Sequence, residues 1–174
     1  MIRTIMIFPE LENIEIIDSI RKKYDPLADL VRPHITIVFP FESEMSNDEL
    51  AAVLDERLKD IPSFDLELRG FGKQSEAFGD FLFLNLVKGT EWIVKMHDRF
   101  YSNEFKQFFM DYPYSPHMTV GKLSTVEELE EAFGSVQTIE DSFKTKVTKI
   151  SVEMIGEHEE SIIILEKELG SDVK

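Results

Sequence analysis

The sequence contains the tetrapeptide Pro-His-x-Thr twice, once at residues 33–36 and again at residues 116–119. In each copy the proline precedes a short run of apolar and β-branched residues. Proline is tolerated at the first residue of a strand, and it holds the residue before it in an extended conformation. The repeated tetrapeptide therefore predicts two strands that begin in the same way, at residues 34–39 and 117–122.

Alternation along these two strands separates polar from apolar side chains, because successive side chains of a strand point to opposite faces. His34 and Thr36 share one face of the first strand, and His117 and Thr119 share one face of the second. The intervening residues are apolar and are expected to pack against helices. If the two strands occupy equivalent places in a repeated fold, both histidines and both threonines line one cleft.

The elements around the two motifs recur in the same order. Strands are predicted at residues 3–8, 34–39 and 64–71 and again at 80–87, 117–122 and 145–155, with a final strand at 160–168. Helices are predicted at residues 10–24 and 90–109, and after the capping boxes Ser46/Glu49 and Thr125/Glu128. This repetition predicts an internal duplication within a single domain, 1–174, whose lobes span about residues 1–75 and 76–174.

The fold class follows from the type of strand and connection. Amphipathic strands and a closing hairpin at residues 145–168 favour an α+β fold with mostly antiparallel sheets over a parallel α/β sheet. The repeat is far longer than the repeats of solenoids, so two facing lobes are expected. We therefore predict a bilobal molecule with two sheets related by a pseudo-two-fold axis, helices on the outer faces and a central cleft.

Composition limits the partners of this chain. A net charge of −15 disfavours non-specific binding to long nucleic acid or to anionic membranes, although a local cleft can still bind a small phosphorylated ligand. No apolar run approaches the roughly 18 residues of a membrane span, and residues 1–16 lack signal-peptide features. The absence of cysteine excludes disulfides, thiolate catalysis and cysteine-ligated zinc. We expect a cytoplasmic monomer without a membrane partner.

Two histidines and two hydroxyls in one cleft suit the chemistry of phosphodiester bonds. Histidine titrates near neutral pH, so one imidazole can accept a proton from the attacking oxygen while the other donates one to the leaving oxygen. Threonine hydroxyls can donate hydrogen bonds to the phosphoryl oxygens. This chemistry needs no metal or other cofactor, and neither His34 nor His117 has a carboxylate at ligand-like spacing.

The paired His-x-Thr strands, their separation and the repeated halves resemble the 2H phosphoesterase superfamily, which includes bacterial 2′-5′ RNA ligase-type proteins and cyclic nucleotide phosphodiesterases. Residues 21–41 and 114–122 resemble its small bacterial YjcG-like branch. The resemblance implies that His34, Thr36, His117 and Thr119 are catalytic. It also implies metal-independent action on 2′,3′-cyclic phosphates or 2′-5′ linkages. The acidic charge departs from many RNA-processing relatives and favours a small nucleotide or an RNA end as substrate.

Other residues near the motifs are weaker candidates for substrate binding. Arg3, Arg32 and Lys122 are either phosphate contacts or solvated surface charges, and Tyr114 is a candidate for stacking on a base. Alternation places Gly121 on the His/Thr face, where it leaves room for a ligand, and points Lys122 to the opposite face unless the strand ends before it.

Three further features have alternative interpretations. Phe81, Phe83 and Asn85 share one strand face, and the phenylalanines either line the cleft or, as we favour, fill a second core layer. His97 is expected to be a partly buried helix residue. His158 is expected to be solvated in a hairpin turn.

Two functions remain open at this point. The first is a metal-independent hydrolase that acts on cyclic phosphates or 2′-5′ bonds. The alternative is a module that binds a nucleotide and signals its presence with little or no turnover. All four motif residues are intact, which favours the enzyme. The sequence does not determine which histidine is the acid, the direction of reaction or the base preference.

Overall fold

The computed structural model describes residues 1–171, and its strands form one curled antiparallel sheet of eight strands. The strand order is β6-β3-β4-β5-β2-β1-β7-β8. The strands are β1 (Ile2–Ile7), β2 (Ile35–Glu42), β3 (Phe64–Glu76), β4 (Gly79–Lys88), β5 (His117–Leu123), β6 (Phe143–Val147), β7 (Lys149–Ile155) and β8 (Ser161–Glu168). The helices are α1 (Ile14–Tyr24), α2 (Asn47–Leu58), α3 (Thr90–Tyr101), the 3₁₀ helix η1 (Lys106–Phe108) and α4 (Val126–Val136).

The sheet has two halves that meet between β2 and β5. Within the described chain these two strands pair at one position, Ile35 opposite Met118. This contact makes one continuous sheet, where the sequence predicted two. One half contains β1, β2, β7 and β8, and the other contains β3 to β6. The halves therefore do not coincide with residues 1–75 and 76–174, because the C-terminal strands β7 and β8 extend the half that begins with β1.

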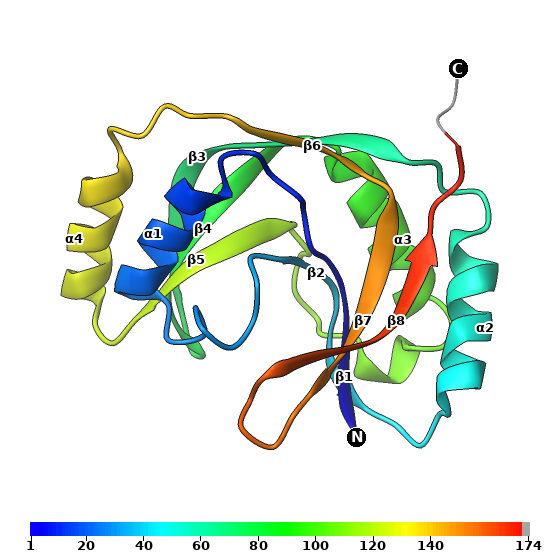
Figure 1. The fold of residues 1–174 in the computed structure, drawn as a ribbon. Coiled ribbons are helices and arrows are strands. Elements are labelled where there is room, and N and C mark those ends of the chain that lie inside the picture. Colours follow the sequence, from blue (N-terminus) through cyan, green and yellow to red (C-terminus); the bar gives the residue numbers. More distant parts are fainter. Residues whose placement is uncertain (172–174) are drawn as a thin grey trace.

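The helices form two pairs at opposite ends of the molecule, α1 with α4 and α2 with α3 (Figure 1). Two of the helices, α1 and α3, each follow a strand of one half of the sheet and pack against a strand of the other half. The chain enters α1 from β1, yet α1 packs against β5, while α3 follows β4 and packs against β2. No helix within residues 1–171 has the length and apolar character needed to cross a bilayer.

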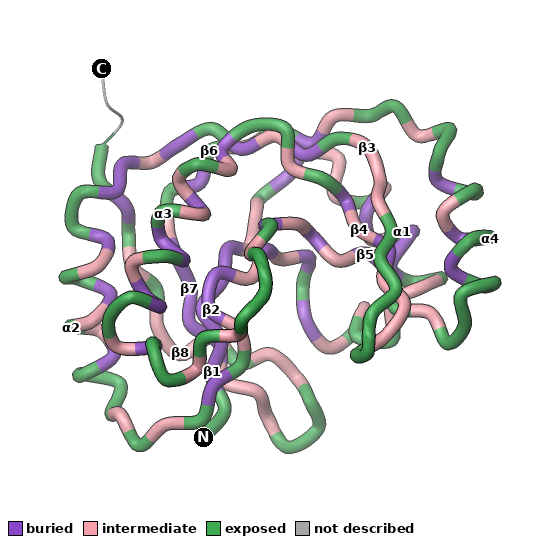
Figure 2. The backbone as a smooth tube through the Cα atoms, turned by 180° about the vertical axis from the view of Figure 1, so that it is seen from behind, coloured by how far each residue is buried: buried purple, intermediate pink, exposed green. Residues whose placement is uncertain are grey.

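The core confirms the predicted alternation at the start of the two motif strands, from His34 to Ile37 and from His117 to Val120, whereas Phe39, which was predicted on the apolar face, lines a pocket with His34 and Thr36. Ile35 and Ile37 in β2 are fully buried, as are Met118 and Val120 in β5. Figure 2 shows β1 as largely buried and β2 as partly buried, whereas the turn between β7 and β8 is exposed at residues 157–159. The apolar side of each motif strand is thus fixed in the core, which leaves the other side available for a site.

One predicted strand is divided in the structure. Residues 145–155 were expected to be continuous, but Thr148 separates β6 from β7. β6 pairs with β3 in one half of the sheet, whereas β7 pairs with β1 and β8 in the other. The chain crosses between the halves at this residue. Residue patterns do not encode which strands will be neighbours, so the break was not predicted.

Candidate active site

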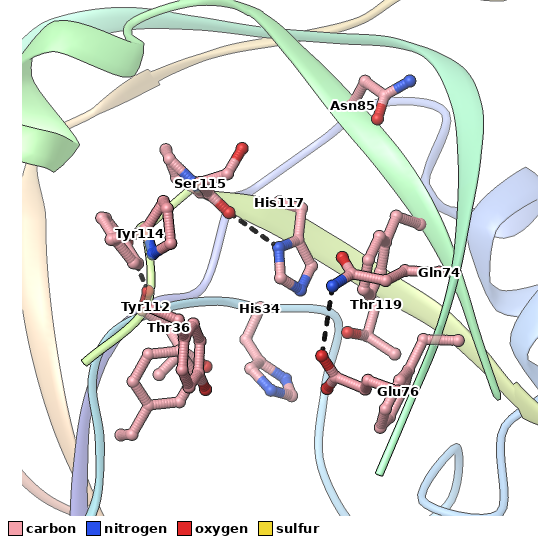
Figure 3. Close-up of a pocket in the computed structure, with 15 residues that line it drawn as sticks. His34, Thr36, Gln74, Glu76, Asn85, Tyr112, Tyr114, Ser115, His117 and Thr119 are labelled. Atoms are coloured by element: carbon pink, nitrogen blue, oxygen red, sulfur yellow. Dashed lines mark hydrogen bonds between the residues drawn. The ribbon is translucent and has the colours of Figure 1, made fainter. Parts of the chain in front are cut away.

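A pocket of about 270 Å³ lies where the two motif strands meet, and all four motif residues line it. His34 directly precedes β2 and His117 is the first residue of β5, while Thr36 and Thr119 follow two positions later. Figure 3 shows the four side chains projecting from two neighbouring strands into the same space. The contact of Ile35 with Met118 on the same two strands brings the motifs together.

Both histidines are oriented by the same backbone hydrogen bond. His34 Nδ1 lies 2.8 Å from the carbonyl oxygen of Arg32, and His117 Nδ1 lies 2.9 Å from that of Ser115. A carbonyl oxygen only accepts hydrogen bonds, so Nδ1 carries the proton in each ring. This leaves both Nε2 atoms free to accept or donate a proton. The two rings are therefore prepared for acid/base chemistry in the same tautomer.

Both motif strands carry a β-bulge directly after the threonine. The register of β2 with β1 skips Ile37, and the register of β5 with β4 skips Val120. A bulge bends a strand and increases its twist. The two strand pairs thus share a local geometry as well as a sequence motif.

The bulge at Val120 makes the predicted orientations of Gly121 and Lys122 wrong. A Cβ atom on Gly121 would lie 2.9 Å from the Cβ of Tyr24 and 3.2 Å from that of Leu82, on the face that packs against α1. Gly121 therefore points away from the pocket. Lys122 lies opposite Phe81 in the register, and its Nζ is 5.7 Å from the centre of that ring. The extra residue reverses the alternation on which the prediction depended.

Of the four weaker candidates, Tyr114 lines the pocket and the three basic residues do not. Arg3 is buried in β1, and its guanidinium donates to the carbonyl and hydroxyl oxygens of Ser43. Arg32 is exposed, with its guanidinium carbon 4.5 Å from the centre of the Phe8 ring. Lys122 is also exposed. The structure thus brings Tyr114 together with the motif residues and leaves the arginines and the lysine outside the pocket.

Tyr114 is held by protein groups. Its ring stacks on His97 with 3.6 Å between centroids and an interplanar angle of 3°, and its hydroxyl donates to the carbonyl oxygen of Thr36 at 2.6 Å. His97 is almost fully buried. His158, in contrast, is exposed in the β7–β8 turn, as expected.

Three residues of β4 line the pocket, which resolves an alternative that the sequence left open. Phe81, Phe83 and Asn85 face the pocket, whereas Leu82 and Leu84 are fully buried on the other face. The Phe83 and His117 ring centroids lie 3.8 Å apart. The alternation correctly predicted that these three side chains share one face, but our preference for placing the two phenylalanines in a second core layer was wrong.

Four polar residues of the pocket were not identified from the sequence: Gln74, Glu76, Tyr112 and Ser115. Gln74 and Glu76 come from the far end of β3, and the Gln74 amide donates to the Glu76 carboxylate at 3.2 Å (Figure 3). The predicted strand ended at residue 71, but β3 continues to Glu76 because it pairs with β4 from Glu67 to Glu76. The strand predicted at 80–87 begins soon after Glu76, and this position was the available signal for a hairpin.

The electrostatics of the pocket favour neutral imidazoles. Burial lowers the pKa of His34 and of His117 from the usual 6.5, because it disfavours the charged ring. The hydrogen bonds to the backbone carbonyls oppose this shift in part, and the Glu76 carboxylate also acts to raise the pKa of His117. None of the pocket-lining residues in the described chain is a lysine or an arginine. Within residues 1–171, no group of three or more histidine and acidic side chains is arranged to hold a metal ion.

Comparison with known structures finds the same fold over the whole chain. The apo crystal structure of Escherichia coli LigT matches with a TM-score of 0.61 at 15% identity and covers 98% of both chains. The crystal structure of LigT complexed with 3′-AMP matches with a TM-score of 0.60 at 17% identity, covering 96% of this chain and 97% of LigT. The α+β architecture with a curled antiparallel sheet is thus shared with LigT.

The sequence comparisons find bacterial relatives that are provisionally named phosphoesterases. One from Bacillus licheniformis is 28% identical over 138 residues, which is 76% of this chain and 78% of the relative. One from Staphylococcus aureus strain JH1 is 23% identical over 169 residues, covering 95% of this chain and 97% of the relative. The model of the 2′-5′ RNA ligase superfamily matches residues 8–158. The chain therefore belongs to the 2′-5′ RNA ligase superfamily, within the 2H phosphoesterases.

Proposed function

We propose that this protein is a metal-independent phosphoesterase that acts on 2′,3′-cyclic phosphates or 2′-5′ phosphodiester bonds of small nucleotides or RNA ends. The observation that carries the proposal is the matched pair of histidines. Each donates Nδ1–H to a backbone carbonyl two residues earlier, and both line one pocket. Family membership supports the same class of chemistry.

The proton transfers follow from the tautomers. For a 2′,3′-cyclic phosphate, the neutral histidine accepts a proton from water at Nε2 while the water oxygen bonds to phosphorus. The bond from phosphorus to one ribose oxygen breaks, and the protonated histidine gives its Nε2 proton to that oxygen. Thr36 and Thr119 donate hydrogen bonds to the phosphoryl oxygens, on which negative charge gathers in the transition state. Solvent exchange then restores the starting protonation of the two rings.

The charge of the pocket supports a phosphodiester substrate. A cyclic phosphate or a 2′-5′ linkage carries one negative charge, whereas a terminal phosphate carries up to two. A lining with hydroxyls, amides and one carboxylate, and with no lysine or arginine among its described residues, is better suited to the single charge. Aromatic side chains of Phe81 and Phe83 offer an apolar wall for the nucleoside.

The proposal is tested by turnover assays in the presence of EDTA. The substrates are the four nucleoside 2′,3′-cyclic phosphates, short RNAs that end in this group, and a 2′-5′-linked dinucleotide. We expect His34→Ala and His117→Ala each to reduce kcat by about 10²–10⁴-fold. His158→Ala, which removes the exposed histidine of the β7–β8 turn, is the matched control and is expected to retain full activity. A kcat within about twofold of wild type in either pocket variant would disprove the two-histidine mechanism.

A second set of variants tests the hydroxyls. Thr36→Val and Thr119→Val replace each hydroxyl with a methyl group of similar shape. Each is expected to lower kcat by about 10²-fold, as loss of one transition-state hydrogen-bond donor does. Binding of a nucleotide at equal strength to wild type and His34→Ala, with no turnover by either, would instead favour a nucleotide sensor.

A further inference from the structure

Within residues 1–171, the edge of β2 that faces β5 continues beyond Ile35 without a strand beside it. In this described part of the chain β5 pairs with β2 at Ile35 alone, so the backbone groups that follow need other partners. Three side chains hydrogen-bond to this segment. Tyr114 donates to the carbonyl of Thr36 at 2.6 Å and His97 donates to the carbonyl of Ile37 at 2.9 Å, while the Tyr101 hydroxyl accepts from the amide of Phe39 at 3.1 Å. Side chains thus take the place of a strand directly beside the first motif.

These side chains also contact one another. His97 lies between two tyrosines, stacked on Tyr114 at 3.6 Å and 4.5 Å from Tyr101 between ring centroids. His97 and Tyr101 belong to α3, whereas Tyr114 belongs to the segment that leads into His117. Burial raises the pKa of the Tyr114 hydroxyl, so it remains protonated and able to donate.

The Tyr114 hydrogen bond connects the two motifs. Tyr114 lies three residues before His117, and its hydroxyl bonds the backbone of Thr36, which is itself a motif residue. In the described chain, the pairing of Ile35 with Met118 and an edge-to-face contact of the Tyr114 ring with Phe39 of β2, at 6.3 Å between centroids, also connect the two motifs. Acid and base must act on the same phosphoryl group, so their separation has to be held within a few tenths of an ångström.

We propose that Tyr114 and His97 are positioning residues that fix the separation of the two motif strands and thereby align His34 and His117 on one phosphoryl group. This inference rests on the proposed function. It assigns Tyr114 a role other than base stacking. One face of its ring is covered by His97, and its hydroxyl is already bonded to Thr36. His97 acts through Tyr114 and through the Ile37 carbonyl, without contact to substrate.

The first test is Tyr114→Phe, which keeps the ring and removes the hydroxyl. We expect kcat on the best nucleoside 2′,3′-cyclic phosphate to fall about tenfold, with KM changed less than about twofold, because alignment is lost and binding is not. Tyr24→Phe is the matched control. It removes a tyrosine hydroxyl that lies 2.9 Å from Ser135 Oγ, outside the pocket, and it is expected to leave kcat unchanged.

A second variant keeps the test decisive if Tyr114→Phe does not fold. His97→Phe retains a ring against Tyr114 and removes the donor to Ile37. We expect kcat to fall about threefold, again with little change in KM. The double variant should lose less than the product of the two single losses, because both substitutions loosen the same strand.

A third measurement does not depend on turnover. Amide hydrogen exchange around Ile35 and Met118 should be faster in Tyr114→Phe by about tenfold, while exchange in the β1–β7 pair around Ile5 and Val152 should match that of Tyr24→Phe. Faster amide exchange at the contact of β2 with β5 would support the proposal that Tyr114 holds the two motif strands together, even if no substrate is found.

The outcomes separate this inference from the proposed function. An active wild type with kcat of Tyr114→Phe within twofold of Tyr24→Phe would overturn the inference and leave the proposed function intact. A wild type inactive on every substrate would remove the proposed function, and hydrogen exchange would then decide alone. Unchanged amide hydrogen exchange at Ile35 and Met118 would disprove the proposed role of Tyr114 in fixing the separation of the two motif strands.

Discussion

The chain reaches the two motif histidines through two segments that are held in different ways. Residues 25–33 lead to His34 and are anchored by Arg21, whose side chain is 2% exposed. Arg21 pairs with Asp25 at 2.8 Å and donates to the carbonyl of Val31 at 2.8 Å and that of Leu27 at 3.3 Å. Residues 109–116 lead to His117 and are held by Tyr114, which stacks on His97 and bonds to β2.

The difference separates two structural tasks. Arg21 bonds residues within ten positions of itself, so it folds one approach segment onto its own helix. Tyr114 bonds Thr36, which is 78 positions away, so it joins the approach of one motif to the strand of the other. A buried charge needs all of its partners, whereas a stacked tyrosine keeps most of its packing when the hydroxyl is removed. We therefore expect Arg21 to control stability and Tyr114 to control alignment.

Arg21→Met is expected to give the largest effect on stability. It leaves the Asp25 carboxylate buried without its cation and removes the Arg21 donor from the Val31 carbonyl, which should lower the free energy of unfolding by about 3–5 kcal/mol. Urea denaturation measures this loss. Arg57→Met is the matched control. Arg57 pairs with Glu104 at 2.7 Å but is 24% exposed, so a much smaller loss is expected. Equal losses would show that the burial of Arg21 is unimportant.

Gly121→Ala should have the next largest effect, because α1 approaches β5 closely at this glycine. The new Cβ would lie 2.9 Å from the Cβ of Tyr24, and relief of the clash should cost about 1–3 kcal/mol of unfolding free energy. Gly134→Ala makes the same change in α4, where no atom lies within 4 Å, and should gain about 0.5–1 kcal/mol. Thermal unfolding compares the two, and a neutral Gly121→Ala would contradict the packing of α1 on β5.

The pH dependence tests the two histidines together. Burial lowers the pKa of both rings below 6.5, and the reaction needs one ring protonated and the other neutral. As pH rises above 6.5, the ring that must act as the acid loses its Nε2 proton and becomes neutral. The value of kcat/KM should therefore fall from pH 6.5 to pH 8.5. Removal of the Glu76 charge in Glu76→Gln lowers the pKa of His117, so the alkaline fall should move to lower pH. His158→Gln should not move it. A rate that still rises above pH 7.5 would contradict this assignment.

The smallest effects are expected at the basic residues beside the two motifs. Arg32 precedes Pro33 and Lys122 follows Gly121, and both side chains are exposed and outside the pocket lining. Arg32→Ala and Lys122→Ala should each change KM for a nucleoside 2′,3′-cyclic phosphate by less than about twofold, as exposed charges usually do. A tenfold rise in KM would place a second phosphate contact beside the pocket.

Local patterns predicted the parts of the molecule that local chemistry determines. The capping box at Ser46 and Glu49 forms with both of its hydrogen bonds, and Thr125 caps α4 through the Glu128 amide. In the second case the Glu128 carboxylate accepts from Ser124 in place of Thr125. The four motif residues were predicted to line one cleft because the prolines before the strands, the alternation of side chains and the repeated motif all indicated the same arrangement.

The errors arose where neighbouring strands decide the outcome. The bulge at Val120 reversed the predicted faces of Gly121 and Lys122. The residue types in the strand do not indicate that a bulge forms there. Arg3 looked like a phosphate contact from its position near the motif, but pairing of β1 between β2 and β7 buries it. Pairing partners are set by the whole sheet, and a single sequence does not encode them locally.

The position of β1 has a consequence for how the chain acquires its structure. β1 is an inner strand of the sheet, with β2 on one side and β7 on the other, and the paired residues of β7 come about 150 positions later. During synthesis β1 therefore lacks one of its two neighbours until about 150 further residues have emerged. Contacts of such large sequence separation slow folding and leave a strand edge open in the meantime. The pairing of β1 with β7 is thus expected to be a late step of folding, with β1 among the segments that a chaperone would protect.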